Sequence, residues 1–173
     1  VIVLGARLGV RVGPSEMFKL RWEHVDLSKG VVRVQAAAKN KSEPWREVPI
    51  KSSLIPLFEE WMEQDGGTGY IINLNGKPIS SIKTAWRNAC RAAGITRKIR
   101  PYDLRHAFAT DAIAAGADIG TVAKLMGHTS PQMVLKHYQH VMTQQKQAAV
   151  EALPDFPLGD RVWVTKEKGV ILQ

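Results

Sequence analysis

The sequence predicts an α+β domain that is mainly helical and carries a small three-stranded antiparallel sheet. Residues 31–34 and 45–50 are β-branched or alternate in polarity, and they flank a polar turn, which predicts a hairpin. A third, short strand is expected at residues 70–72. Over most of residues 52–153, apolar positions recur at helical spacing between capping residues and glycines, which predicts helices.

Two short helices are predicted before the hairpin. Residues 1–9 are mainly apolar and form a helix that ends at its final glycine. Ser15 follows a Gly-Pro turn signal and caps a second helix over residues 16–22. Because the chain opens on Val1 within an apolar segment, we expect it to be a piece of a longer protein.

Five helices are predicted after the hairpin, from caps, glycine stops and apolar spacing. The first is expected from Ser52 or Ser53 to residue 62 and the second from Ser80 or Ser81 to residue 94. The other three are expected at 101–116, 118–127 and 131–153. The final residues, 154–173, change in character and are expected to form a separate tail. Within this tail, residues 161–164 favour a last strand or an ordered arm over the core.

The composition favours a polyanionic partner. Lys plus Arg number 24 against 16 Asp plus Glu, which gives a net charge of +8. Nucleic acid is the common partner for such a charge, and a merely basic surface is the alternative.

The cysteine content limits the possible chemistry. Cys90 is the single cysteine, so the chain cannot form an internal disulfide or a Cys-rich zinc site. We expect Cys90 to be a small buried hydrophobe. No apolar segment approaches the ~20 residues of a membrane span, and the absence of disulfides fits a reducing cytoplasm.

Two stretches concentrate functional groups. Between positions 100 and 110, two arginines, an aspartate, a tyrosine and a histidine stand in an otherwise apolar segment. Such groups are costly to bury, so they indicate a site. A second stretch runs from Leu125 to His128 and continues at residues 137–140. With an early arginine and a lysine of the hairpin turn, the two stretches are expected to form one phosphate-handling site.

Together these residues resemble the catalytic domain of the tyrosine recombinases, the phage integrase family. The four matches are Gly9-Val10-Arg11 with Glu16 and residues 20–27, Lys39-Asn40 with residues 46–50, residues 103–106 with 108–110, and Met126-Gly127-His128 with Tyr138 and His140. The resemblance implies a catalytic domain over residues 1–153, with the family's N-terminal core-binding domain outside this chain. It makes the tail, 154–173, a candidate for exchange between protomers.

The resemblance implies a site-specific recombinase that breaks and rejoins DNA. A tyrosine hydroxyl attacks a phosphodiester, which gives a 3′-phosphotyrosine and a free 5′ hydroxyl. Two arginines can hold the non-bridging oxygens, and a mobile lysine can protonate the departing oxygen. No metal or nucleotide cofactor is expected, because the bond energy is kept in the phosphotyrosine link.

Carried over residue by residue, the resemblance gives Arg11 and Arg105 as the phosphate-binding arginines and Tyr138 as the nucleophile. His128 follows a helix end and is expected to donate to a phosphate oxygen; interaction with the helix dipole is the alternative. The spacing from Arg11 to the following glutamate is longer than usual in the family, so Arg7 is a minor rival.

The proton-transfer groups leave more alternatives open. Lys39 is the expected general acid, and Lys41 on the same turn is the alternative. Tyr102 stands three residues before the second arginine, where the family usually has histidine. Because tyrosine is a poor base near neutral pH, Tyr102 is expected to position the phosphate, and a role as nucleophile is less favoured. Structural or peripheral roles are expected for Glu16, Asp26, His24, His106, His137 and His140.

The resemblance also implies partners and a location. Double-stranded DNA is the expected substrate, with a homo-tetramer on DNA during synapsis and a monomer or weak oligomer without it. No membrane is involved, and a bacterial or phage-encoded protein in the cytoplasm is expected. Two alternatives differ in function: a type IB topoisomerase, which relaxes DNA without pairing sites, and an inactive DNA-binding relative.

Overall fold

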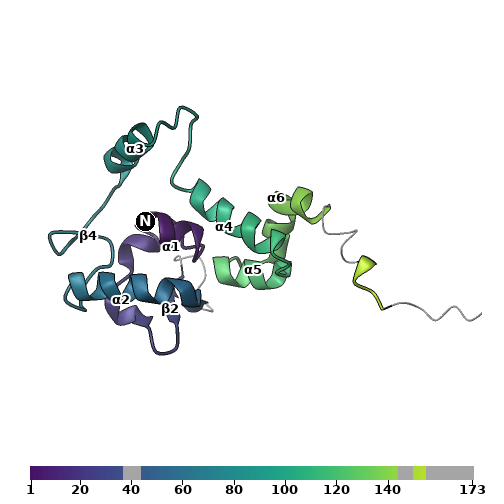
Figure 1. Ribbon diagram of the computed structural model, residues 1–173, viewed down its shortest axis with the longest axis horizontal. Coiled ribbons are helices and arrows are strands. Elements are labelled where there is room, and N and C mark those ends of the chain that lie inside the picture. Colours follow the sequence, from purple (N-terminus) through teal and green to yellow (C-terminus); the bar gives the residue numbers. More distant parts are fainter. Residues whose placement is uncertain (37–43, 144–149, 155–173) are drawn as a thin grey trace, which may run out of the picture.

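The computed structural model describes residues 1–36, 44–143 and 150–154. Its helices are α1 (Ile2–Ala6), α2 (Ile55–Gln64), α3 (Lys83–Ala92), α4 (Asp103–Ala114), α5 (Ile119–Met126) and α6 (Pro131–Thr143). Its strands are β1 (Val25–Asp26), β2 (Val31–Gln35), β3 (Trp45–Pro49), β4 (Asn73–Leu74) and β5 (Lys77–Pro78). The predicted final strand at 161–164 lies outside the described residues, and the mainly helical α+β class is confirmed (Figure 1).

The main sheet has the order β1-β2-β3, and both pairings are antiparallel. Residues 31–34 and 45–50 form the predicted hairpin, in which Val32 pairs with Val48 and Val34 with Arg46. Successive residues of a strand point to opposite faces, so Arg46 shares the core-facing side of β3 with the buried Val48. A charged side chain therefore points toward the interior from the middle of the sheet.

Two sequence predictions around this sheet are wrong, and both concern segments that pair with each other. The third strand is β1, not residues 70–72, and residues 16–22 form 3-10 turns at Met17–Lys19 and Trp22–His24 instead of a helix. Leu20 is extended, and its carbonyl oxygen accepts from the Ile71 backbone over 3.0 Å. The Trp22 backbone donates in turn to the Gly69 carbonyl over 2.9 Å. Pairing between distant segments thus replaces the predicted helix, while the predicted strand at 70–72 is reduced to a single antiparallel bridge between Arg21 and Tyr70.

The interior consists of two hydrophobic clusters. The first lies among α1, α2 and the sheet, and its members include Leu4, Leu8, Trp22, Val34, Val48 and Phe58. The second lies among α4, α5 and α6, which gather beside one another in Figure 1. Its members are Ala109, Ile113, Val122, Ala123, Met126, Val134 and Tyr138. The clusters meet where α1 packs against α4 and where β3 packs against α5.

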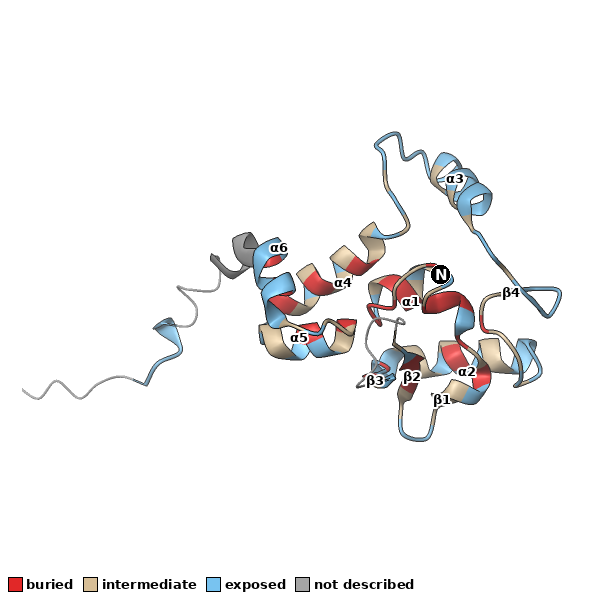
Figure 2. Cartoon of the chain, turned by 180° about the vertical axis from the view of Figure 1, so that it is seen from behind, coloured by how far each residue is buried: buried red, intermediate tan, exposed pale blue. Residues whose placement is uncertain are grey.

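Helix α3 stands apart from both clusters. It has no buried residue along its described length, as Figure 2 shows. Cys90 is accordingly only half-buried, so the prediction that it is a buried hydrophobe is wrong. The apolar side of α3, with Ile82, Trp86 and Ala89, instead lines a groove shared with Trp61. No helix in the described part of the chain is long and apolar enough to cross a membrane.

Replacing Gly9 with alanine is expected to destabilise the protein more than the same change at Gly66. Both glycines have a left-handed backbone, with φ of +62° and +72°, so each alanine carries a similar strain of about 1–2 kcal/mol. An added Cβ at Gly9 would lie 2.5 Å from Cδ1 of Phe108, whereas no described atom lies within 4 Å of one at Gly66. Urea unfolding should show an additional loss of about 1–3 kcal/mol for Gly9→Ala. Equal losses would mean that the Phe108 ring moves aside freely.

Candidate active site

Arg105 lies in the buried stripe of α4, where Ala109 and Ile113 follow at intervals of one helical turn. None of its side chain is exposed. Its guanidinium donates to the Gly9 carbonyl oxygen over 2.7 Å and to the Met126 carbonyl oxygen. These acceptors belong to the loop after α1 and to the end of α5. Arg105 therefore joins α4 to both clusters.

Glu16 is the anionic centre around which the arginines gather, and it is only 1% exposed. Its Oε2 accepts from Arg46 Nη2 over 2.7 Å and from the Arg11 backbone nitrogen over 3.0 Å, and it lies 3.5 Å from Arg105 Nη1. The Arg11 Nε lies 3.7 Å from Oε1. Three arginines face one carboxylate, so the cluster keeps an excess of positive charge. Arg11 leaves 36% of its side chain exposed, which makes that charge accessible to an anion from solvent.

Arg46 is a member of this cluster that the sequence reasoning gave no role. Its Nε donates to the Leu125 carbonyl over 2.8 Å, so Arg46 and Arg105 both bind carbonyls at the end of α5. Gly127 ends α5 with a left-handed backbone, and a Cβ there would lie 2.8 Å from Arg46 Nη1. The predicted end of α5 at Gly127 is thus confirmed, together with the Asp118 cap that starts the helix. The sequence feature that could have indicated a role for Arg46 was its position two residues before Val48, on the same face of β3.

His128 is brought to the cluster by this helix end. Its backbone nitrogen donates to the Ala123 carbonyl over 2.9 Å, and its Nε2 lies 3.4 Å from Arg105 Nη2. Burial, and then the charges of Arg105 and Arg11, lower the pKa of His128 to about 4. The ring is therefore neutral at pH 7, and a neutral ring gains little from the helix dipole.

Tyr138 lies on α6 and is 4% exposed. Its hydroxyl oxygen is 2.6 Å from Nδ1 of His106, the residue after Arg105 on α4. Burial chiefly raises the pKa of Tyr138 to about 12, while the charge of Arg105 acts in the opposite direction. His106, for which the sequence predicted a structural or peripheral role, thus contacts the hydroxyl of the predicted nucleophile.

Tyr102 lies at the start of α4, with its ring edge-on to His106 at 5.1 Å between centroids. Burial is the main cause that lowers the pKa of His106. Tyr102 itself is 36% exposed. Tyr102 thus contacts His106, and His106 in turn contacts Tyr138.

The remaining predicted residues divide into those placed elsewhere and those not described. Arg7, the rival of Arg11, pairs with Asp111 at the surface over 2.7 Å, and it is Arg11 that contacts Glu16. Lys39 and Lys41 lie outside the described residues. Their role as general acid stays a prediction.

The comparisons with known proteins decide the family. The pattern of the phage integrase family matches residues 3–145, most of the chain. The chain belongs to the phage integrase family. It is 31% identical over 159 residues to the tyrosine recombinase XerD of Pseudomonas putida. The aligned segment covers 81% of this chain and 49% of that protein. The chain thus spans about half the length of such relatives.

Two solved structures, one of a recombinase and one of an integrase, share the fold. The XerA recombinase has a TM-score of 0.67 at 23% identity, covering 89% of this chain and 57% of that one. The Tn1549 transposon integrase in complex with circular intermediate DNA has a TM-score of 0.68 at 21% identity, covering 89% and 58%. These likenesses confirm the predicted tyrosine-recombinase fold of this family member.

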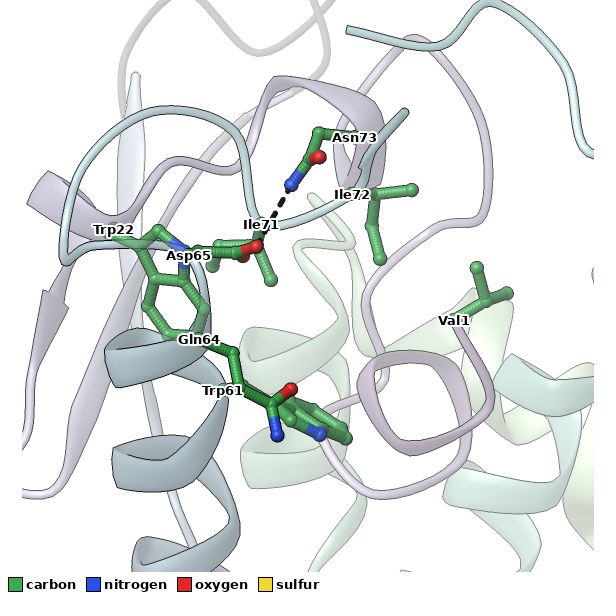
Figure 3. A pocket seen from close by; sticks show the side chains of 8 residues that line it. All are labelled: Val1, Trp22, Trp61, Gln64, Asp65, Ile71, Ile72 and Asn73. Carbon is green, nitrogen blue, oxygen red and sulfur yellow. Dashed lines mark hydrogen bonds between the residues drawn. The ribbon is translucent and has the colours of Figure 1, made fainter. Parts of the chain in front are cut away.

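A pocket near the start of the integrase chain is separate from the arginine cluster. Figure 3 shows it beside Trp22 and Trp61, with Asp65 accepting from Trp22 Nε1 over 2.8 Å and from Asn73 over 3.3 Å. None of the predicted catalytic residues lines it. Among the described residues, no group of three or more His, Cys, Asp or Glu is placed to hold a metal ion.

Glu16→Gln is expected to cost about 3–5 kcal/mol of unfolding free energy, because it leaves buried arginines without their counter-charge. Glu23→Gln is the matched control, since Glu23 pairs with Arg21 at the surface over 3.1 Å. The control should change stability little. Urea unfolding of both variants gives the comparison, and similar small losses would contradict the central role of Glu16.

His128 is expected to contribute to acid destabilisation. Its pKa is about 4 in the folded protein and has an ordinary value of 6.5, so the unfolded chain binds more protons between these values. The stability that His128 contributes is present above pH 6.5 and is lost as the pH falls toward 4. His128→Gln should therefore lose stability less steeply over this interval in urea unfolding at several pH values. An unchanged slope would contradict the lowered pKa.

Proposed function

We propose that the chain is the catalytic part of a site-specific DNA recombinase that cuts and rejoins strands through a 3′-phosphotyrosine intermediate. One juxtaposition on α4 supports this most strongly. Arg105 belongs to the arginine cluster around Glu16, and the next residue, His106, contacts the hydroxyl of Tyr138. One helical turn thus links an anion-binding centre to a tyrosine hydroxyl.

The arginines are suited to hold a phosphodiester. Burial lowers the pKa of Arg105 to about 10, which still leaves it protonated at neutral pH. Arg11, Arg46 and Arg105 each retain one buried nitrogen with no hydrogen-bond partner among the described residues. Oxygens of a bound phosphate would offer acceptors, and preorganised cations stabilise the charge that develops on them during attack.

The remaining chemistry follows from the bonds exchanged. The Tyr138 oxygen bonds to phosphorus, the bond from phosphorus to the 5′ oxygen breaks, and Lys39 or Lys41 supplies the proton to that oxygen. His128, neutral beside Arg105, contacts a phosphate oxygen. A 5′ hydroxyl of the partner strand then reverses the sequence. Since each step exchanges one phosphoester for another, this chemistry needs no cofactor.

The partners follow from charge and family. The excess of 24 basic over 16 acidic residues supports double-stranded DNA as the substrate. A tetramer on DNA and a weaker association without it agree with strand exchange between two paired sites. The bacterial relatives support action in the cytoplasm, and the likeness to a transposon integrase supports a mobile element.

Two other functions are less well supported. A type IB topoisomerase needs the same chemistry, but the matched relatives are recombinases. An inactive DNA-binding relative would have no need for buried arginines beside a tyrosine hydroxyl. The substitution at Tyr102 is its sole support.

A nicked suicide duplex tests the reaction, because loss of the short cut end traps the covalent intermediate. The duplex would carry a site selected from random DNA by binding to the wild-type chain. The wild-type protein should form a covalent complex on a denaturing gel, and Tyr138→Phe should form none. Tyr70→Phe and Tyr102→Phe, which alter the other two tyrosines, should both retain it. Persistence of the complex in Tyr138→Phe, or its absence in the wild type, would overturn the proposal.

A further inference from the structure

The imidazole of His106 contacts the oxygen that the proposed reaction uses as its nucleophile. Nδ1 lies 2.6 Å from the Tyr138 hydroxyl oxygen, and the ring centroids are 5.9 Å apart. At this distance the two groups share a hydrogen bond, and the protonation of each decides its direction.

Several groups face His106. Those on α4 are Tyr102, Asp103 and Arg105, those on α6 are His137 and Tyr138, and Arg100 comes from the preceding segment. Burial lowers the pKa of His106 most, His137 and the two arginines lower it further, and Asp103 raises it. The ring is therefore neutral at pH 7, while Tyr138, with a pKa of about 12, keeps its proton. The hydroxyl donates, and Nδ1 accepts.

We propose that His106 is the general base that takes the proton of Tyr138, a role resting on the proposed recombinase function. Tyr102, at the place where the family usually has histidine, is then a positioning residue. Its ring packs edge-on against His106 at 5.1 Å and holds the imidazole toward α6. Positions 102 and 106 are four residues apart, which is about one helical turn, so both lie on one side of the helix.

The step balances without a further reactant. As the Tyr138 oxygen bonds to phosphorus, its proton passes to Nδ1 of His106. The bond from phosphorus to the 5′ oxygen breaks, and that oxygen takes a proton from an ammonium group. In rejoining, a 5′ hydroxyl attacks phosphorus and gives its proton back to the amine that the ammonium group had become. The phosphotyrosine bond breaks, and His106 returns its proton to Tyr138.

The relative acidities of the Tyr138 hydroxyl and the His106 imidazole decide when the proton is transferred. In the resting protein the phenol binds its proton far more strongly than the imidazole does, so transfer does not occur. Formation of the bond to phosphorus makes the phenol oxygen a much weaker base, and transfer then becomes favourable. His106 therefore acts only when a phosphate is held at Arg105, its neighbour in the chain.

His106→Asn separates proton transfer from positioning, because the asparagine oxygen still accepts a hydrogen bond but does not take a proton. The substrate is the nicked suicide duplex with sulfur in place of the scissile 5′ oxygen. Sulfur leaves as a thiolate, so the rate no longer depends on the lysine. Single-turnover cleavage by His106→Asn should be about a hundredfold slower than wild type, with unchanged DNA affinity. Adding Tyr102→His, which restores an imidazole at position 102, should recover at least tenfold.

The pH profile distinguishes a base from a structural support. Because burial lowers the pKa of His106, the wild-type rate should fall only when the pH drops below the ordinary histidine range and the ring gains a proton, and it should be level above pH 7. His106→Asn should instead rise steadily from pH 7 to 9, because it depends on the small ionised fraction of Tyr138. A His106→Asn rate within a few-fold of wild type, with the same profile, would overturn the base but leave the recombinase function intact. Absence of any wild-type covalent complex would overturn both.

Discussion

One buried carboxylate holds the two hydrophobic clusters of this chain together. Glu16 faces Arg11, Arg46 and Arg105, which come from the loop after α1, from β3 and from α4. Two of these arginines also bind carbonyls at the end of α5. A buried charge is tolerated only when it is paired and hydrogen-bonded, so these contacts must form together. The two hydrophobic clusters are thus joined by charges and carbonyls as well as by apolar contacts.

The same burial shifts the pKa values of neighbouring groups in opposite directions. Exclusion of water lowers the pKa of His106 and His128 and raises the pKa of Tyr138. Arg105 remains charged beside them. The site at rest therefore combines positive charge with a neutral phenol, which is suited to binding a phosphate before any nucleophile exists.

The sequence was sufficient where local chemistry decides the outcome. The hairpin alternation, the Asp118 cap and the glycine end of α5 all appear as predicted. It was insufficient where distant segments compete, because the pairing of Leu20 with Ile71 displaced a predicted helix, and the predicted strand at 70–72 is reduced to one bridge between Arg21 and Tyr70. The role of Arg46 depends on a counter-charge from another segment, and the contact of His106 depends on how α6 packs. Neither the role of Arg46 nor the contact of His106 can be predicted from nearby residues in the sequence, whereas Arg105 and Tyr138 stand in recognisable motifs.

Ionic strength acts differently on the exposed charges and on the buried charges of this molecule. Salt screens exposed charges over roughly 10 Å at 0.1 M, and it weakens contacts between surface lysines or arginines and a DNA backbone. Within the arginine cluster, the contacts between Glu16 and Arg105 are closed to solvent ions because both side chains are buried, whereas Arg11 stays partly exposed. Under the proposed function, counter-ions would therefore govern how often a duplex is captured, whereas the buried contacts that arrange the arginines would stay the same.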